Sequence, residues 1–244
     1  MIIDELRHLS ASIPKQSVIV LHVGLRGLYD KSKGYEHDAL SLLDEIRKQL
    51  EPKEIYVPTF TYTFTKSKVF DVRDTPSEVG RFSEEIRINP ELGVKRNMDP
   101  VFSVVETEGD GLKDMSLITN AFGEKSIWHY LDNESHHILN INLPTNIVSA
   151  QIHHFEYINN ASYRYLKTFE GEVVDWLGEK HFVNYDYFVR DLSKNFKWNR
   201  KKIADLARSN GGMVETSSIR SFDWQILKKS LINELLTDSE YLIT

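Results

Sequence analysis

Apolar residues follow two kinds of pattern in the first quarter of the chain. SVIVLHV at residues 17–23 and EIYVPTF at residues 54–60 are nearly continuous apolar runs, whereas residues 2–12 and 36–50 repeat apolar positions at helical spacing. Continuous apolar strands separated by amphipathic helices are typical of a sheet that is covered on both faces. The pattern therefore predicts the order helix, strand, helix, strand and an α/β fold.

The segment from Thr75 to Glu78 has the signature of a helix start. Thr75 can cap the helix, Pro76 suits its first position, and Glu78 stands where a capping box needs an acid. This helix should end before Pro90. Beyond it, the pattern predicts strands at 101–106 and 136–142, helices at 126–131, 148–159, 196–209 and 222–236, and a hairpin of 169–174 and 180–185 across Trp176-Leu177-Gly178.

Neither a linker nor an internal repeat interrupts these elements. We therefore expect residues 1–244 to form one domain, with a C-terminal α+β subregion that starts near residue 165.

Charge and composition narrow the classes of function. The chain has 30 basic and 36 acidic residues, so nucleic acid and anionic membranes are not expected partners. It has no cysteine, which excludes thiol catalysis, disulfides and thiolate metal sites. There is no secretory signal, and no apolar run approaches the about 18 residues of a membrane span. We expect a cytoplasmic globular protein.

The most informative polar pattern lies in the helix expected at 148–159. Four polar side chains at spacings of four, three and four residues share one face: Ser149, His153, Glu156 and Asn160. The adjacent face is apolar, with Val148, Ile152 and Phe155. A carboxylate that holds one imidazole nitrogen fixes the tautomer and makes the other nitrogen a better base. Taken alone, the same pattern also fits a solvated helix face.

Metal binding is not favoured by the histidine pattern. His153 and His154 point to different faces of a helix, and His136 and His137 point to opposite faces of a strand. We therefore expect no metal cofactor.

Two turns follow the first two predicted strands. His22 stands at the carboxyl end of the first strand, and Pro58-Thr59-Phe60-Thr61-Tyr62 follows the second. Ligands of open α/β sheets bind outside the carboxyl ends of the strands, so both turns should face one crevice.

Several motifs in order resemble the aminoglycoside 3-N-acetyltransferase family of coenzyme A-dependent N-acyltransferases. They cover about residues 17–175 and are Pro58-Thr59-Phe60-Thr61-Tyr62, Phe70-Asp71-x-Arg73-x-Thr75-Pro76-Ser77-Glu78-Val79-Gly80, Arg96…Pro100…Ser103, Phe122-Gly123-x-x-Ser126-x-Trp128, His153-x-x-Glu156, Tyr163-Arg164 and Phe169-x-Gly171. The resemblance implies an α/β/α sandwich around a central mixed sheet, in which acyl donor and amine meet in a cleft at one sheet edge.

The resemblance also implies roles for particular residues. The catalytic residues would be His153, Glu156 and Ser149. Coenzyme A or acetyl-CoA, the acyl donor, would bind at His22, Val23, Gly24, Leu25, Arg26, Thr75, Pro76, Ser77 and Ser103. Its pyrophosphate would need backbone amides, which His22–Arg26 or Thr75–Ser77 could supply. The amine substrate would contact Thr59, Tyr62, Asp99, Tyr163 and Arg164.

The chain departs from the family pattern in three places. It has His22-Val23-Gly24 where His-Ser-Ser is frequent, and Asp99-Pro100-Val101-Phe102-Ser103 where His-Pro-x-His-Ser is frequent. Ala150 replaces a threonine that is associated with stabilising the tetrahedral intermediate, so Ser149 or a backbone amide would take that role. These changes argue against an antibiotic as the natural acceptor.

Three functions remain open from the sequence. The leading hypothesis is N-acyl transfer, typically N-acetyl transfer, to a primary amine of an amino sugar, for instance a nucleotide-linked amino-deoxy sugar used in surface polysaccharide assembly. The alternatives are an aminoglycoside-modifying resistance enzyme and a non-catalytic carbohydrate- or nucleotide-binding protein. The sequence names neither the acyl group nor the acceptor, and a homodimer is a candidate assembly.

Overall fold

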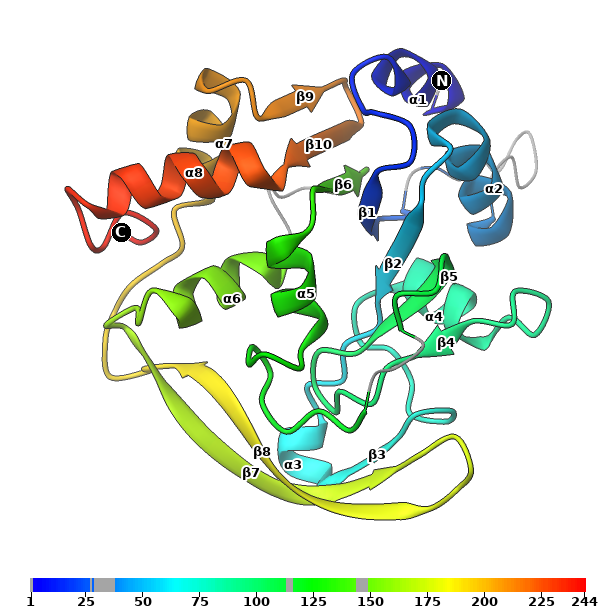
Figure 1. The fold of residues 1–244 in the computed structure, drawn as a ribbon, viewed down its shortest axis with the longest axis vertical. Helices are drawn as coiled ribbons and strands as arrows, with labels where there is room; N and C mark the ends of the chain where they lie inside the picture. Colours follow the sequence, from blue (N-terminus) through cyan, green and yellow to red (C-terminus); the bar gives the residue numbers. More distant parts are fainter. Residues whose placement is uncertain (1, 27, 29–37, 113–115, 144–148) are drawn as a thin grey trace.

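A seven-stranded mixed sheet forms the centre of the computed structural model, which describes residues 2–26, 28, 38–112, 116–143 and 149–244 (Figure 1). Its strand order is β4 (Lys95–Arg96), β5 (Val104–Glu108), β2 (Glu54–Pro58), β1 (Val18–Val23), β6 (His136–Ile141), β10 (Ile219–Asp223) and β9 (Met213–Glu215). β1 pairs in parallel with β2 and β6, and the other pairs are antiparallel.

Helices cover both faces of this sheet, as the apolar strands predict. Ile19 and Leu21 of β1 pack with apolar residues of α1 (Ile2–Ser10), α2 (Ala39–Leu50) and α4 (Arg81–Ile88). The opposite face packs against α5 (Ile127–Asn133), α6 (Gln151–Ile158), α7 (Arg200–Ser209) and α8 (Trp224–Leu235). The expected α/β/α sandwich around a mixed sheet is confirmed. No helix among the described residues is long and apolar enough to cross a membrane.

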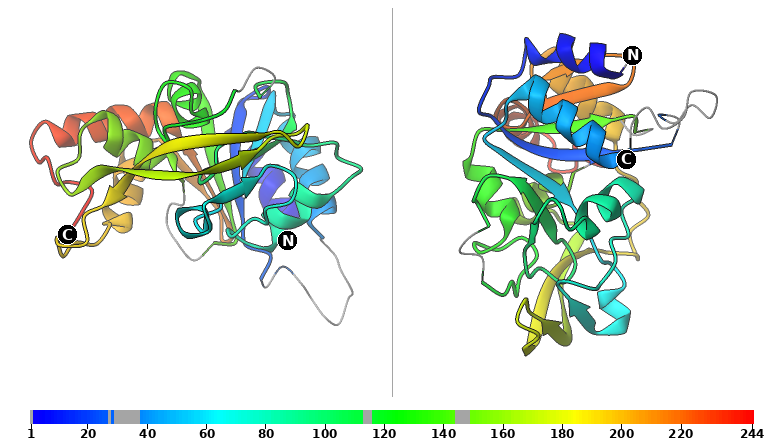
Figure 2. Two further views of the ribbon diagram at one scale, coloured as in Figure 1. Left: turned by 90° about the horizontal axis from the view of Figure 1, so that it is seen from below. Right: turned by 90° about the vertical axis from the view of Figure 1, so that its right-hand side faces the viewer.

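A second sheet lies beside the sandwich. β3 (Val69–Asp71), which follows the short helix α3 (Phe64–Ser67), pairs with β7 (Arg164–Val174), and β7 pairs with β8 (Lys180–Arg190). β7 and β8 form the hairpin that the sequence predicts, and it is longer than expected. Seen from below, it runs across the width of the molecule (Figure 2).

The predicted helix start at Thr75 is wrong. α4 begins six residues later, after Gly80, whose φ of 115° lies in a region that suits glycine. The Thr75 hydroxyl accepts from the amide of Asp71, and the Glu78 carboxylate accepts from the amide of Thr63. Both capping side chains thus hold neighbouring parts of the chain, and the segment does not form a helix.

Two other element boundaries shift for local reasons. The strand expected at 101–106 starts at Val104 because the Asp99 carboxylate accepts from the amides of Val101 and Phe102 and forms a turn there. The helix expected at 148–159 is α6, which begins at Gln151. Ser149 therefore precedes the helix, and Val148 lies outside the described residues.

Gly171 sits where β7 crosses α3, and this contact leaves no room for a side chain. A Cβ atom at this position would lie 2.6 Å from the Phe64 ring and 2.7 Å from the Lys68 carbonyl oxygen. We predict that Gly171→Ala destabilises the protein by about 1–3 kcal/mol, the usual range for overpacking. Thermal unfolding measures the loss, and Glu170→Ala, an exposed neighbour, should unfold like the wild type. An unchanged Gly171→Ala midpoint would contradict this close contact.

Candidate active site

His153 and Glu156 form a hydrogen-bonded pair on α6. The Nδ1 atom of His153 lies 2.7 Å from Oε2 of Glu156, as the spacing of three residues on one helix predicts. The Glu156 side chain is fully buried, whereas 24% of the His153 side chain is exposed. One end of the imidazole is thus held inside the protein and the other end faces the surface.

Glu156 is surrounded by donors from three parts of the chain. Its Oε1 accepts from the Tyr163 hydroxyl at 3.0 Å and from the Trp198 indole at 2.7 Å. Its Oε2 lies 2.7 Å from Nε of Arg164. Burial alone would raise the pKa of Glu156, but the interaction with His153, the positive charge of Arg164 and the hydrogen bond from Trp198 outweigh it and lower the pKa. Glu156 is therefore an ionised, buried carboxylate.

This carboxylate determines which tautomer His153 adopts. Arg164 Nη2 also lies 2.9 Å from His153 Nδ1, yet a guanidinium only donates. Because Nδ1 cannot donate to Glu156 and accept from Arg164 at once, the ionised carboxylate favours a proton on Nδ1. Nε2 then carries the free lone pair. Burial lowers the pKa of His153 below its usual value, so the ring is neutral at pH 7.

Aromatic rings flank the imidazole. The Trp198 ring lies 4.6 Å from the His153 ring with an interplanar angle of 36°, and the Phe122 ring lies 6.2 Å away on the 121–126 loop. The contact of Trp198 with this pair is not visible in the sequence, because 42 residues separate it from Glu156 and no local spacing connects them.

Ser149 does not share the helix face of His153. It lies before the first residue of α6, and its hydroxyl oxygen accepts from the amide of Gln151 at 3.0 Å. Asn160 follows the helix with a φ of 50°. The structure thus brings His153 and Glu156 together as expected, but the four-residue polar face does not form.

The carboxyl end of β1 is tied to that of β6. The backbone amide of Gly24 donates to the carbonyl of Ile141. The side-chain amide of Asn142 donates to the carbonyls of Gly24 and Arg26. A Cβ atom on residue 24 would lie 2.5 Å from the Asn142 carbonyl oxygen, which explains the glycine. His22 and Val23 are buried in β1, and Leu25 packs against the apolar cluster beneath α2.

The backbone amides of Thr75 and Ser77 both have partners within the protein. Thr75 donates its amide to the carbonyl of Asp71, Pro76 has no amide hydrogen, and Ser77 donates its amide to the Glu84 carboxylate at 2.7 Å. An anion at these amides would have to displace Glu84, and the assignment of a pyrophosphate to them stays a prediction.

Several of the residues expected to contact ligands belong to a buried network around Arg96. The Arg96 guanidinium donates to the hydroxyls of Thr59 and Ser103 at 3.1 Å each and to the carbonyl of Thr75 at 2.6 Å. Thr59 and Ser103 are completely buried, so their hydroxyls face the interior and not a cleft. Tyr62, at 43% exposure, is available on the surface.

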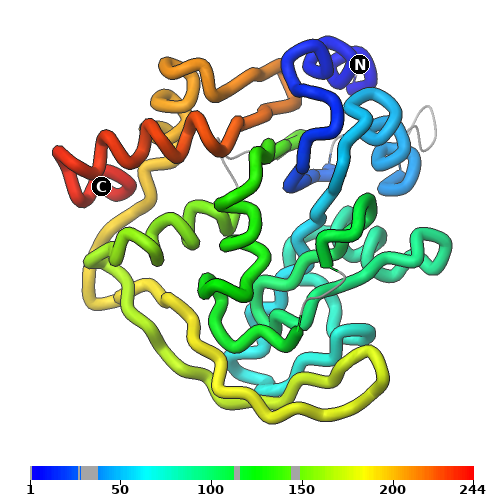
Figure 3. The backbone as a smooth tube through the Cα atoms, viewed as in Figure 1, coloured from blue at the N-terminus to red at the C-terminus, as the bar shows by residue number. Residues whose placement is uncertain are grey.

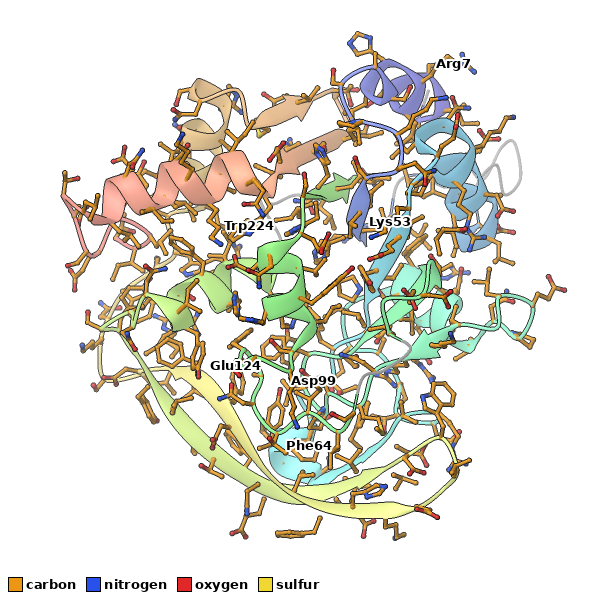
Figure 4. All side chains as sticks on the ribbon, in the orientation of Figure 1. Arg7, Lys53, Phe64, Asp99, Glu124 and Trp224 are labelled. Atoms are coloured by element: carbon orange, nitrogen blue, oxygen red, sulfur yellow. The ribbon has the colours of Figure 1, made fainter. Side chains whose placement is uncertain are left out.

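Asp99 is also an interior residue. Figure 4 shows it in the middle of the molecule, above Phe64. Its Oδ1 accepts from the Tyr185 hydroxyl at 2.6 Å as well as from two backbone amides, and burial raises the pKa of Asp99 to about 6. Asp99 therefore shapes the turn that leads into β5 and has no exposed oxygen.

Among the described residues, His153 belongs to no group of three possible metal ligands. His136 and His137 point to opposite sides of β6, as expected. Among the described residues, one group of three has ligand atoms within 4.8 Å of one another: Asp175, Glu179 and His181 at the hairpin turn.

Comparison with known proteins now adds to this geometry. The family model described as aminoglycoside 3-N-acetyltransferase matches residues 44–230. The chain belongs to this family. It is thus an acetyltransferase of the aminoglycoside 3-N-acetyltransferase type, whose members are N-acyltransferases that use acetyl-CoA as the donor. The expectations of an N-acyltransferase and of an acyl-CoA donor are therefore confirmed.

Solved structures of the same type share the fold. Aminoglycoside acetyltransferase AAC(3)-Xa has a TM-score of 0.75 at 18% identity, over 98% of this chain and 93% of that one. Sisomicin-bound AAC-VIa has a TM-score of 0.74 at 16% identity, over 96% of each chain. AAC-IIIb in a binary complex with CoASH has a TM-score of 0.73 at 14% identity, over 95% of each chain. No curated protein sequence matches this chain.

The environment of Asp99 yields a test of its interior role. Because burial raises its pKa to about 6 from an ordinary value of about 3.9, ionisation destabilises the fold increasingly as pH rises between these values. We predict that Asp99→Asn is at least as stable as the wild type at pH 8, and that this relative advantage shrinks as pH falls through the same window. Thermal unfolding against pH measures it.

The matched control is Asp132→Asn. Asp132 is also buried, but it lies 2.5 Å from Lys228 Nζ and accepts from the Trp224 indole, so its loss should destabilise the protein at pH 8. If Asp99→Asn unfolded as early as Asp132→Asn, the assignment of Asp99 as a destabilising interior carboxyl would be refuted.

Proposed function

We propose that this protein transfers an acyl group, typically acetyl, from acyl-CoA to a primary amine of an amino sugar, with His153 as the general base. The observation that carries the proposal is the His153–Glu156 pair, which leaves Nε2 of a neutral imidazole toward the surface. Membership of the family supports acyl-CoA as the acyl donor. The roles of individual residues given below are our own assignment.

The chemistry needs a proton to leave the amine. An alkyl or sugar amine resembles the Lys side chain, whose pKa is about 10.4, and is mostly protonated at pH 7. The ammonium group first loses one proton to solvent. His153 Nε2 then takes a second proton as the neutral nitrogen attacks the thioester carbonyl; a C–N bond forms and the C–S bond breaks. The imidazolium then returns its proton to the departing thiolate, so no covalent enzyme intermediate is needed. The lack of cysteine agrees with direct transfer.

Other residues position this base or hold the substrates. Glu156 orients His153 and balances its transient charge, and Tyr163, Arg164 and Trp198 orient Glu156. We assign Ser149, which lies two residues before the start of α6, to the rim of the acyl site. The turn from His22 to Arg26 is our proposed donor edge. Thr59, Ser103 and Asp99 act from the interior, whereas Tyr62 lies at the surface for contact.

The acceptor we propose is an amino sugar, for instance one linked to a nucleotide, and not an aminoglycoside antibiotic. Its support is the set of changes at Asp99, Phe102 and Ala150 relative to the family pattern. The second candidate, an aminoglycoside, has support from the relatives described as bound to sisomicin and to a gentamicin. The hydrogen-bonded pair of His153 and Glu156 argues against a binding-only protein. We further propose a cytoplasmic enzyme, with a homodimer as candidate assembly.

His153→Ala tests the proposed base. Loss of general-base catalysis lowers rates by about 10²–10⁴-fold, so turnover should fall by that order while acetyl-CoA still binds. Thiol release measures turnover over a panel of amines, and calorimetry measures acetyl-CoA binding. Wild-type activity should decline on the acid side with an apparent pKa below the usual imidazole value, because burial lowers the pKa of His153.

Two neighbouring variants serve as controls. Glu156→Gln should reduce turnover less than His153→Ala, because the geometry is kept while the charge is lost, and Ser149→Ala should reduce it least. Unimpaired turnover of His153→Ala would rule out the assigned base, and no acetyl-CoA binding by the wild type at millimolar concentration would rule out the donor.

Expression in a susceptible host separates the two acceptor classes. We predict no more than about a twofold change in tolerance to gentamicin, because the proposed acceptor is not an aminoglycoside. A His153→Ala strain at equal protein level controls for expression. A many-fold rise in tolerance that requires His153 would establish the aminoglycoside as the acceptor instead.

A further inference from the structure

A strongly basic segment borders the reaction site. Residues 190–202, RDLSKNFKWNRKK, contain six basic residues and one acidic residue in a chain whose net charge is −6. This segment joins β8 to α7, and Figure 3 shows it in gold on the left of the molecule, beside the end of α6. Its positive charge is therefore local and opposite in sign to the whole protein.

Hydrogen bonds fix the middle of the basic segment against the catalytic pair. Trp198 donates its indole N–H to Glu156 and lies against the His153 ring. The backbone of Trp198 bridges to Ile243, and the Asn199 amide donates to the carbonyl of Leu242. Arg200 thus begins α7 two residues from a side chain that contacts both catalytic residues.

Most cations of the basic segment already have partners. Lys201 lies 2.6 Å from Asp205, and Lys202 lies 3.5 Å from Asp238. Arg190 and Lys194 donate to the backbone carbonyls of Phe196 and Ser162. Arg200 and Lys197 are the exceptions, since within the described parts of the chain neither side chain has a carboxylate or carbonyl partner. Of the two, Arg200 lies over the Trp198 ring, 5.9 Å from its centroid.

The position of Arg200 is unfavourable for the protein alone. It is the first residue of α7, where the helix dipole is positive and disfavours a cation. Its charge also reaches His153 and lowers the pKa of the imidazole. A cation that destabilises its own helix and acts on the catalytic base is better explained by a negative charge on the bound substrate.

The acids beside His153 and on the loop of Phe122 each have a basic neighbour. The negative charge of Glu156 is offset by Arg164 at 2.7 Å. The loop that carries Phe122 exposes one acid and one base, Glu124 and Lys125, and so contributes no net charge. A polycationic aminoglycoside would meet net positive charge on the Trp198 side of His153, whereas a phosphate would be attracted there.

We propose that the acceptor amine is borne by a phosphate-linked sugar, and that Arg200 binds this phosphate while Trp198 packs against the sugar or base. This inference rests on the proposed function and narrows its acceptor. Arginine suits the role because its guanidinium recognises phosphate through two parallel hydrogen bonds. Coenzyme A also carries phosphates, and the experiment therefore measures donor and acceptor separately.

Two acceptors that share one amine test the proposal: D-glucosamine and D-glucosamine 1-phosphate. Wild-type kcat/KM should be about tenfold higher or more for the phosphate, the size expected for one charge-assisted contact at a partly exposed site. Arg200→Gln should reduce that preference to near one, mainly through KM, and leave the calorimetric Kd for acetyl-CoA unchanged.

Lys201→Gln is the matched control. It removes the same charge from the adjacent position, but its side chain is directed to Asp205, so the phosphate preference should remain. Equal loss in both variants would show a general charge effect and overturn the assignment to Arg200. A weaker Kd for acetyl-CoA in Arg200→Gln would assign the arginine to the donor instead.

The outcomes also separate this inference from the proposed function. If the wild type acetylates glucosamine at least as well as its phosphate, the proposed acyl transfer stands and the phosphate site is refuted. If neither amine reacts, calorimetry of the wild type with inorganic pyrophosphate decides the inference. The phosphate site is supported if the wild type binds pyrophosphate and if Arg200→Gln, but not Lys201→Gln, weakens this binding. It is refuted if the wild type does not bind pyrophosphate.

Discussion

The buried carboxylate of Glu156 is the interaction on which the site depends. A charge without solvent needs hydrogen bonds and a counter-charge, and here an indole, a phenol, an imidazole and a guanidinium supply them. These donors come from α6, from the start of β7 and from the segment before α7. The carboxylate thereby joins three distant parts of the chain at one point and fixes the imidazole in the tautomer that a base requires.

The sheet and most of its helices could be predicted because their information is local. β1 is buried along its whole length, and its residues form a nearly continuous apolar run in the sequence. The His153–Glu156 pair could also be predicted, since a spacing of three residues on one helix places two side chains together. The contact of Trp198 could not, because only the folding of the chain after β8 brings its indole to Glu156.

The errors arose where polar side chains serve tertiary contacts. Thr75 and Glu78 have the right types and spacing for a capping box, yet both bind to loops outside their own segment. Ser77 likewise donates its backbone amide to the carboxylate of Glu84. A family motif in this region therefore marks a brace between β2, β3 and α4, and a short polar pattern alone cannot distinguish a brace from a ligand cradle.

In the proposed mechanism, catalysis and acceptor choice belong to different parts of this architecture. The imidazole and its carboxylate need only α6 and a ring of donors, and these requirements are the same whichever amine reacts. The acceptor, in contrast, meets the surface that surrounds the imidazole. Here one side of that surface is the segment from Arg190 to Lys202, whose charge can vary without disturbing the sheet or the pair. Trp198 connects the two parts, because its indole stabilises Glu156 while the next turn of chain presents Arg200. A fold of this type can thus keep one reaction and change its substrate through the sign of the charge beside the base.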